Sequence, residues 1–260
     1  MNGAVPPRPD LGPGELKPGP PPATWKAIEA LPVGLIALGA TAIVGAIIAH
    51  VVAPGATAGQ LKDNPTVFTF ANLAQELLLL GTVVVWVRFV NHGPLAALGI
   101  PRRLTPVDAA VGLAGGVSMV FAAGLVFQIV HAIVDAIAGH SVGNPAQVPE
   151  TVTGGLLAVS GVVVIVLAPM AEETFFRGFL YKALRRRFSV WPAALMSGAI
   201  FGAVHFSELR SLLIIPSLVV VGIVLAMVYE RRQSLLASIA THATFNLVGF
   251  IFIVVSRSKG

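Results

Sequence analysis

The sequence predicts an all-α, polytopic integral-membrane helical bundle with about seven transmembrane helices. Apolar residues make up 55% of the 260 positions, charged residues only 11%, and the mean hydropathy is +0.84. Long apolar runs recur along the chain and are separated by short loops that contain most of the Lys and Arg. In a membrane protein this excess of basic residues is a topology signal. We therefore expect a lipid bilayer around the protein and no nucleic-acid partner.

The elements follow from these runs in order. Residues 1–26 are rich in Pro and Gly and predict a disordered cytoplasmic tail, without the apolar core of a signal peptide. The expected spans are 31–52, 65–88, 107–134, 154–180, 190–206, 209–229 and 234–255. Residues 27–152 then form a set of N-terminal transmembrane helices, and residues 153–256 form a second helical unit.

The loop charges predict the orientation of the chain. An odd number of spans places the two termini on opposite sides of the membrane. With the N-terminus in the cytoplasm, twelve Lys and Arg fall inside and four outside. We expect a multi-pass protein of the plasma membrane with a cytoplasmic N-terminus and an external C-terminus, and the composition suggests a bacterial source.

The stretch 171–177, Ala-Glu-Glu-Thr-Phe-Phe-Arg, places three ionisable side chains inside the fourth span. Charges at this depth are expensive and indicate a functional site. Glu173 and Arg177 are four residues apart and predict an ion pair on one helix face, whereas Glu172 lies about 100° around the helix. Pro169 predicts a kink just before the two glutamates.

Three polar residues on later spans are expected at a similar depth. Counted from the cytoplasmic end of each span, Glu172 lies ~15 Å deep, His242 ~12 Å, Asn246 ~18 Å and His205 ~22 Å. Span ends are defined only to within a few residues, so these depths agree. The four residues are therefore predicted to meet in one layer of the bundle.

Such a layer has the groups needed for peptide hydrolysis. Glu172 is the candidate base that activates water, and His205 would position the same water or share its proton. His242 and Asn246 could donate to the oxyanion. Alternatively, Glu172, His205 and His242 could bind Zn²⁺ and activate a metal-bound water. The chain has no His-Glu-x-x-His motif, and with no Cys it has no thiol nucleophile or thiolate ligand.

The motifs Glu172-Glu173-x-x-x-Arg177, Phe201-x-x-x-His205 and His242-x-x-x-Asn246, in this order on successive apolar segments, resemble the CPBP family. This family contains the type II CAAX prenyl proteases and the bacteriocin-processing (Abi) enzymes. The resemblance implies that residues 153–256 are a catalytic helical core open to the cytoplasm. It also implies that Glu172 and His205 activate water, that His242 and Asn246 stabilise the oxyanion, and that Glu173 and Arg177 support them. Family members are commonly named metalloproteases, although the prenyl protease branch resembles a glutamate-dependent enzyme.

The expected function is that of an intramembrane endopeptidase acting on a membrane peptide, a membrane protein or a prenylated substrate. One alternative is a non-catalytic bacteriocin-immunity or scaffold protein. The other is a proton-coupled transporter that uses Glu76, Glu172 and the histidines as a relay. Glu76 shares a helix face with Asn72, and we favour a structural role for this face through hydrogen bonds to another helix.

Overall fold

The computed structural model describes residues 21–100, 103–143 and 148–258. Most of the predicted tail, residues 1–20, therefore lies outside the described residues, as do Arg102 and Lys259 of the charge count. The α-helices are α1 (Ala30–Val52), α2 (Ala58–Lys62), α3 (Pro65–Val85), α4 (Pro106–Ala138), α5 (Gly154–Val162), α6 (Ala168–Glu173), α7 (Lys182–Leu184), α8 (Val190–Ala203), α9 (Ile215–Arg232) and α10 (Leu235–Arg257).

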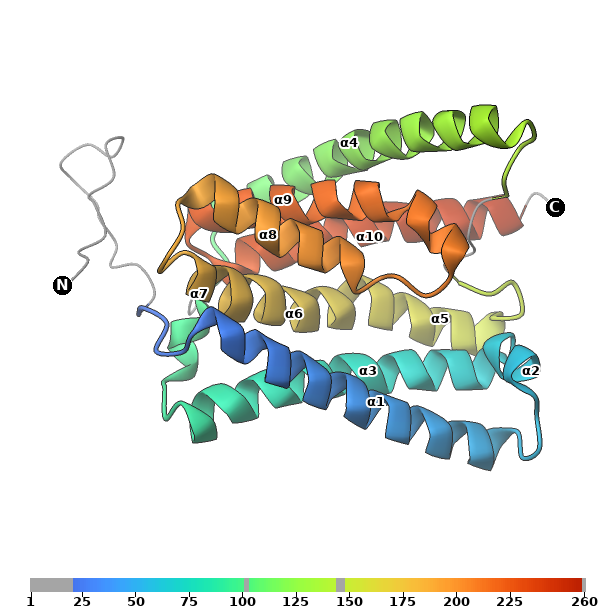
Figure 1. The fold of residues 1–260 in the computed structure, drawn as a ribbon, viewed down its shortest axis with the longest axis horizontal. Coiled ribbons are helices and arrows are strands. Elements are labelled where there is room, and N and C mark those ends of the chain that lie inside the picture. Colours follow the sequence, from blue (N-terminus) through green and yellow to red (C-terminus); the bar gives the residue numbers. More distant parts are fainter. Residues whose placement is uncertain (1–20, 101–102, 144–147, 259–260) are drawn as a thin grey trace.

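The long helices lie nearly side by side along the long axis of the molecule (Figure 1). α1 packs on α3 along one side, and α4, α8, α9 and α10 form the other side. The helix that contains α5, α6 and α7 lies between these two groups. Helix α1 begins at the end of the bundle where α7 lies, and α10 ends at the opposite end. The predicted helical membrane bundle is confirmed.

Within the described residues, five helices are long and apolar enough to cross a membrane. They are Ala27–Val52, Pro65–Val90, Pro106–Ala138, Gly154–Leu184 and Leu235–Arg257. Helix α8 is apolar but shorter, and α9 ends in the charged run Glu230-Arg231-Arg232. Both lie within the bundle beside the other helices (Figure 1). Helix α8 falls within the predicted fifth span, whereas α9 begins six residues later than the predicted sixth span, after a separate 3-10 helix at Leu209–Leu213.

The helices expose large apolar side chains outward and meet through small residues. Ile43 of α1, Phe121 of α4 and Phe252 of α10 are all more than 60% exposed, which suits contact with lipid chains. Where α4 meets α10, a Cβ added at Gly116 would lie 2.5 Å from Thr244 Cβ. Glycine therefore lets these two helices approach closely, as is common in membranes.

The short segment before α1 packs against the middle helix. Trp25, which the sequence analysis places in the tail, is fully buried and stacks on Phe179 with a centroid distance of 4.9 Å. Its indole N–H donates to the carbonyl of Phe179 at 2.8 Å. At the same end of the bundle, Arg185 donates hydrogen bonds to Glu230. These bonds raise the pKa of Arg185. These contacts fix the end of the helix that holds the two glutamates.

Candidate active site

The chain from Gly154 to Leu184 is one long helix whose hydrogen-bond register changes along its length. π-Helical segments, Val163–Leu167 and Thr174–Tyr181, flank α6 on both sides. Pro169 lies in the first turn of α6 and has no N–H to donate. The hydrogen-bond register therefore changes on both sides of Pro169, whereas the kink expected there stays a prediction. π-Helical turns inside α-helices are frequent at functional sites.

Asn246 satisfies a carbonyl that Pro169 leaves free. In a π-helix each carbonyl accepts from the N–H five residues later, which for Val164 is the missing N–H of Pro169. The side-chain amide of Asn246 on α10 donates instead to the Val164 carbonyl at 2.7 Å. Asn246 therefore ties α10 to the irregular part of the middle helix, and the second N–H of the same amide remains a donor.

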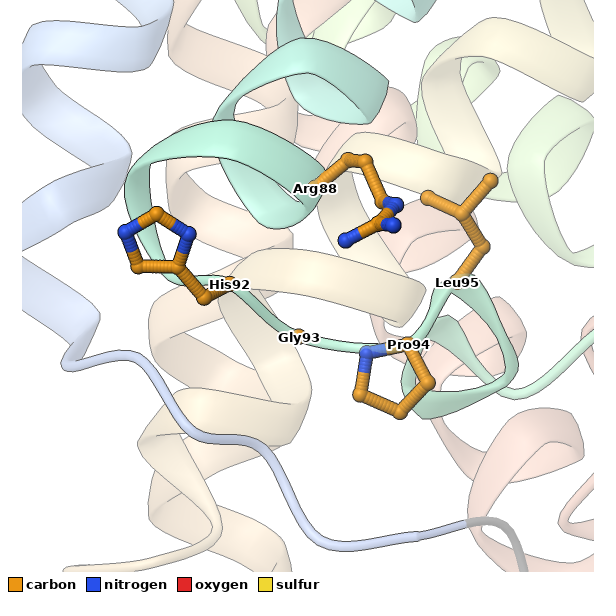
Figure 2. Close-up of a pocket in the computed structure, with 5 residues that line it drawn as sticks. All are labelled: Arg88, His92, Gly93, Pro94 and Leu95. Carbon is orange, nitrogen blue, oxygen red and sulfur yellow. The ribbon is translucent and has the colours of Figure 1, made fainter.

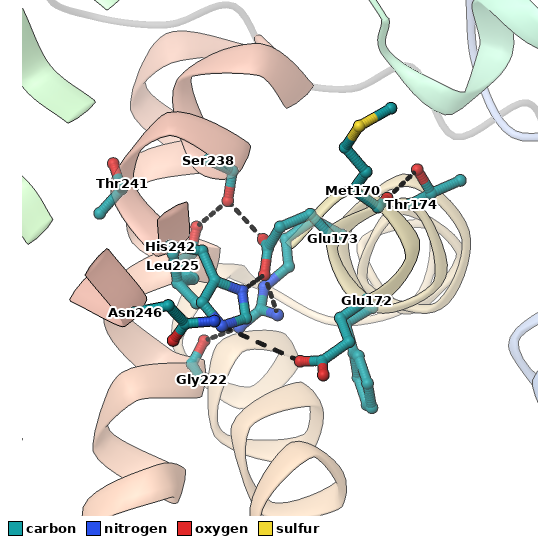
Figure 3. Close-up of polar contacts among 12 residues, drawn as sticks. Met170, Glu172, Glu173, Thr174, Gly222, Leu225, Ser238, Thr241, His242 and Asn246 are labelled. Atoms are coloured by element: carbon teal, nitrogen blue, oxygen red, sulfur yellow. Dashed lines mark hydrogen bonds and ion pairs between the residues drawn. The ribbon is translucent and has the colours of Figure 1, made fainter. Parts of the chain in front are cut away.

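Glu173 is the centre of a buried polar network (Figure 3). Its side chain is fully buried, and Oε1 accepts from Nη1 of Arg177 at 2.8 Å. Oε2 accepts from the hydroxyl of Ser238 on α10 at 2.6 Å. The predicted four-residue ion pair is therefore present, and a carboxylate of α6 is also held by α10.

Arg177 is equally buried and is held by more than its carboxylate partner. Nη2 donates to the carbonyl of Gly222 on α9 at 2.8 Å, and the guanidinium carbon lies 4.9 Å from the centroid of the Phe201 ring. A cation over an aromatic face is attracted by the ring quadrupole. The Glu173–Arg177 pair thus joins α8, α9 and α10 to the middle helix.

His242 links the two glutamates. Its Nδ1 lies 3.0 Å from Oε1 of Glu173, and a carboxylate can only accept, so Nδ1 has the hydrogen. Its Nε2 points to the other glutamate and lies 3.9 Å from Oε2 of Glu172 (Figure 3). Glu173 therefore fixes both the orientation of the imidazole and the atom that it presents to Glu172.

Glu172 differs from Glu173 in that its carboxylate is not saturated. Its side chain is 15% exposed, and its buried Oε2 has no hydrogen-bond partner among the described residues. Helix geometry explains the difference, because Glu172 points about 100° away from the face that Glu173 shares with Arg177. Of the two adjacent glutamates, Glu173 therefore has hydrogen-bond partners on both oxygens, whereas Glu172 has one oxygen without a partner among the described residues.

His205 lies at the end of α8 and is half-buried. Its Nδ1 lies 2.7 Å from the carbonyl of Phe201, which can only accept, so Nε2 is the proton acceptor of the neutral ring. The Phe201 ring contacts both imidazoles, with centroid distances of 4.9 Å to His205 and 5.9 Å to His242. Phe201 therefore holds the two histidines on one side of the bundle.

The structure does not assemble the proposed zinc ligands. In the described part of the chain, no three His, Cys, Asp or Glu side chains lie close enough together to hold a metal ion. Glu172 and His242 face one another, whereas His205 does not complete a set with them. We therefore assign no metal ligands.

Two residues of this region have contacts that the sequence analysis did not anticipate. Ser238 was not singled out, although it precedes His242 and Asn246 by four and eight residues on one face of α10. The four-residue spacing from Ser238 to His242 and Asn246 is the sequence pattern that could have indicated a role for Ser238 in the site. Glu76 on α3 is buried as expected, but it makes no hydrogen bond to another helix within the described residues.

A separate surface hollow lies in the loop after α3 (Figure 2). It is lined by Arg88, His92, Gly93, Pro94 and Leu95. These residues follow α3 at its far end, and none of them belongs to the network of Glu172 and Glu173. The polar network inside the bundle therefore remains the candidate site.

Comparison with known proteins finds a family match over the part of the chain that contains this network. Residues 154–248 match the family model described as "Type II CAAX prenyl endopeptidase Rce1-like". The match includes Glu172, His205, His242 and Asn246. The resemblance of these motifs to the CPBP family is thereby confirmed. No solved structure matches the chain.

Curated relatives match stretches of similar length. An "Uncharacterized 24.3 kDa protein" of Escherichia coli is 32% identical over 91 residues, 34% of this chain and 42% of that protein. "UPF0177 protein YaiF" of Lactococcus lactis is 33% identical over 113 residues, 44% of this chain and 49% of the relative. "Putative membrane peptidase YdiL" of Bacillus subtilis is 26% identical over 107 residues, which are 40% of this chain and 42% of that protein. The chain spans less than half the length of these relatives.

Proposed function

Because residues 154–248 belong to the Rce1-like family, we propose that the chain is an intramembrane endopeptidase that uses Glu172 to activate water. One observation supports this role above all others. Both oxygens of Glu173 accept hydrogen bonds, whereas the adjacent Glu172 has a buried oxygen without a partner among the described residues and faces His242. An unsatisfied ionisable group inside a membrane protein is costly and is typical of a functional site.

The first step is attack of water on the peptide carbonyl. Glu172 takes one proton from the water, whose oxygen forms a bond to the carbonyl carbon while the π electron pair moves to the carbonyl oxygen. His205 assists, because its Nδ1–H is engaged by the Phe201 carbonyl and its Nε2 is the free acceptor. Glu172 then returns the proton to the leaving amine as the C–N bond breaks.

The second requirement is stabilisation of the oxyanion. When both ring nitrogens of His242 have a hydrogen, Nδ1–H donates to Glu173 and Nε2–H can donate to the oxyanion. The Glu173–Arg177 pair is internally neutralised, so it orients the imidazole without placing a net charge beside it. Asn246 supplies the second donor through the N–H that Val164 does not accept.

The substrate class follows from the location of the site. Glu172 lies within a candidate membrane span, so a peptide must reach it from the bilayer or from the membrane surface. We propose a membrane peptide, a membrane protein or a prenylated peptide as substrate. We also propose a cytoplasmic N-terminus and an external C-terminus, in accord with the basic residues around Lys182–Leu184 and the end of α9.

The experiment is cleavage of a library of membrane peptides by the purified protein in detergent, with products identified by mass spectrometry. Wild-type protein should give defined products, and Glu172→Gln should give none while remaining folded. Thr69→Val is a matched control, because Thr69 is buried on a neighbouring helix and its side chain bonds to Ser160 alone among the described residues. Equal products from Glu172→Gln and wild type would refute the proposal.

A further inference from the structure

The surface hollow after α3 lies at the edge of a candidate membrane span. The span Pro65–Val90 ends two residues after Arg88, so Arg88 and His92 lie where the apolar part of α3 is followed by a polar loop. The ends of a spanning helix lie at the level of the lipid headgroups. The hollow has a volume of about 560 Å³, which is within the range of about 300–1,000 Å³ that is typical of small-ligand sites.

The turn that forms the hollow is held by its backbone. The N–H groups of Asn91 and Gly93 donate to carbonyls of the last helical turn at 2.9 and 2.8 Å. His92 lies between them with a φ of 49°, a conformation that residues other than Gly rarely adopt. The chain therefore turns sharply at the end of the helix. In the view of Figure 2 the guanidinium of Arg88 lies between the side chains of His92 and Leu95.

Arg88 has no carboxylate partner among the described residues. The described carboxyl groups at this end of the bundle are those of Glu29, Asp108 and Glu230. Each of the three accepts hydrogen bonds from side chains other than that of Arg88. The planar N–H groups of the exposed Arg88 guanidinium are thus available to an external oxyanion. Phosphate is an anion that arginine binds through two parallel hydrogen bonds.

The surroundings of the hollow favour a lipid over a free anion. Phe89 and Val90, next to Arg88 in the chain, are 67% and 52% exposed, and Leu95 in the wall of the hollow is also exposed. Basic and apolar groups therefore meet at one place on the surface, as the phosphate and acyl chains of a lipid require.

The charge of this end of the bundle favours a lipid with a net negative charge. Further exposed basic side chains at this end are those of Lys26, Arg103, Arg186 and Arg187. Clusters of Lys and Arg at the end of a spanning helix attract anionic lipids. They raise the local concentration of such a lipid, whereas Arg88 and His92 line the place where its headgroup fits.

We propose that this hollow binds the phosphate of an anionic membrane lipid. The guanidinium of Arg88 donates two N–H groups to phosphate oxygens, and the imidazole of His92 supplies a further donor. The acyl chains extend along Phe89 and Val90 toward the apolar part of α3. The hollow lies apart from the candidate active site, so this inference does not depend on the peptidase proposal.

The test is native mass spectrometry of the full-length protein in detergent with two lipid probes. Phosphatidylglycerol is anionic, whereas phosphatidylcholine has the same phosphate but no net charge. We expect wild-type protein to prefer phosphatidylglycerol, and Arg88→Gln to weaken its binding about tenfold, because a charge-assisted pair of hydrogen bonds is lost. Arg88→Lys keeps the charge without the planar donors, so its affinity should lie between those of wild type and Arg88→Gln.

Arg187→Gln is the matched control. Arg187 is an exposed Arg at the same end of the bundle and does not line the hollow, so this variant should bind phosphatidylglycerol as wild type does. Equal losses in Arg88→Gln and Arg187→Gln would indicate diffuse surface charge and overturn the proposal. Equal binding of the two lipids by wild type would also overturn it. Displacement of phosphatidylglycerol by an equal concentration of inorganic phosphate would identify a free anion as the ligand and overturn the lipid assignment.

A fluorescent label tests the position of the lipid without changing Arg88. The chain has no Cys, so Leu95→Cys and Leu209→Cys each introduce a single labelling site. Leu95 lines the hollow, whereas Leu209 is exposed in the segment between α8 and α9, at the end of the bundle away from α7 (Figure 1). Brominated phosphatidylglycerol should quench the label at Leu95 more than brominated phosphatidylcholine does, with no such preference at Leu209. Equal quenching by the two lipids at Leu95 would overturn the proposal.

Discussion

Replacing Arg177 by Met tests whether the buried ion pair stabilises the bundle. Arg177 and Glu173 are both fully buried, and their closest atoms lie 2.8 Å apart. Met keeps an unbranched apolar stem like that of Arg but has no charged guanidinium, so a carboxylate remains in the interior without its cation. Removing one partner of a buried pair costs about 3–5 kcal/mol.

The structure places the expected cost near the lower limit of this range. Glu173 keeps two other hydrogen bonds after the change, from Ser238 at 2.6 Å and from His242 at 3.0 Å. We therefore expect Arg177→Met to lower the free energy of unfolding by about 3 kcal/mol. That is about a hundredfold change in the unfolding equilibrium.

The assay is unfolding in mixed micelles with increasing denaturing detergent, followed by Trp fluorescence and circular dichroism. The double variant Arg177→Met/Glu173→Gln is the matched comparison, because it removes both charges. It should be less destabilised than the sum of the two single variants, since no buried charge remains unpaired. Additive effects, or a single variant within about 0.5 kcal/mol of wild type, would refute the reasoning.

Two further predictions concern helix packing and the surface. A Cβ at Gly222 would lie 2.6 Å from Gly198 Cα, so Gly222→Ala should force α8 and α9 apart and destabilise the protein by about 1–3 kcal/mol. A Cβ added at Gly249 would have no atom within 4 Å, so Gly249→Ala should not destabilise the protein in this way. Equal thermal midpoints for the two variants would contradict the packing argument. The hydrogen bond from Lys62 lowers the pKa of Glu208, so this pair stabilises the fold at neutral pH and ceases to do so as pH falls through that lowered pKa. The gap in thermal midpoint between wild type and Lys62→Met should close in acid, and a gap independent of pH would contradict this assignment.

The sequence was sufficient to predict the helices because their signals are local. Apolar runs with Pro, Gly or charged ends predicted the spans, and the observed bounds of α1 and α10 differ from them by one or two residues. The fully buried pair of Glu173 and Arg177 was likewise predictable from its four-residue spacing.

Contacts between helices were harder to predict, because the spacing of residues along one helix does not determine which residues of a neighbouring helix lie opposite them. The Glu172–His242 and Glu173–His242 approaches join α6 to α10 and depend on how these helices rotate. Asn246 has a bond to Val164 that exists only because Pro169 and the π-helical register free that carbonyl.

We propose that Glu172 is the base that activates the attacking water. The most direct measurement is the catalytic rate constant on one cleaved membrane peptide, determined for wild type, Glu172→Gln and Thr69→Val at matched folded fractions. We expect a loss of about 10²–10⁴-fold for Glu172→Gln and little change for Thr69→Val. A Glu172→Gln rate constant within a few-fold of wild type would contradict it.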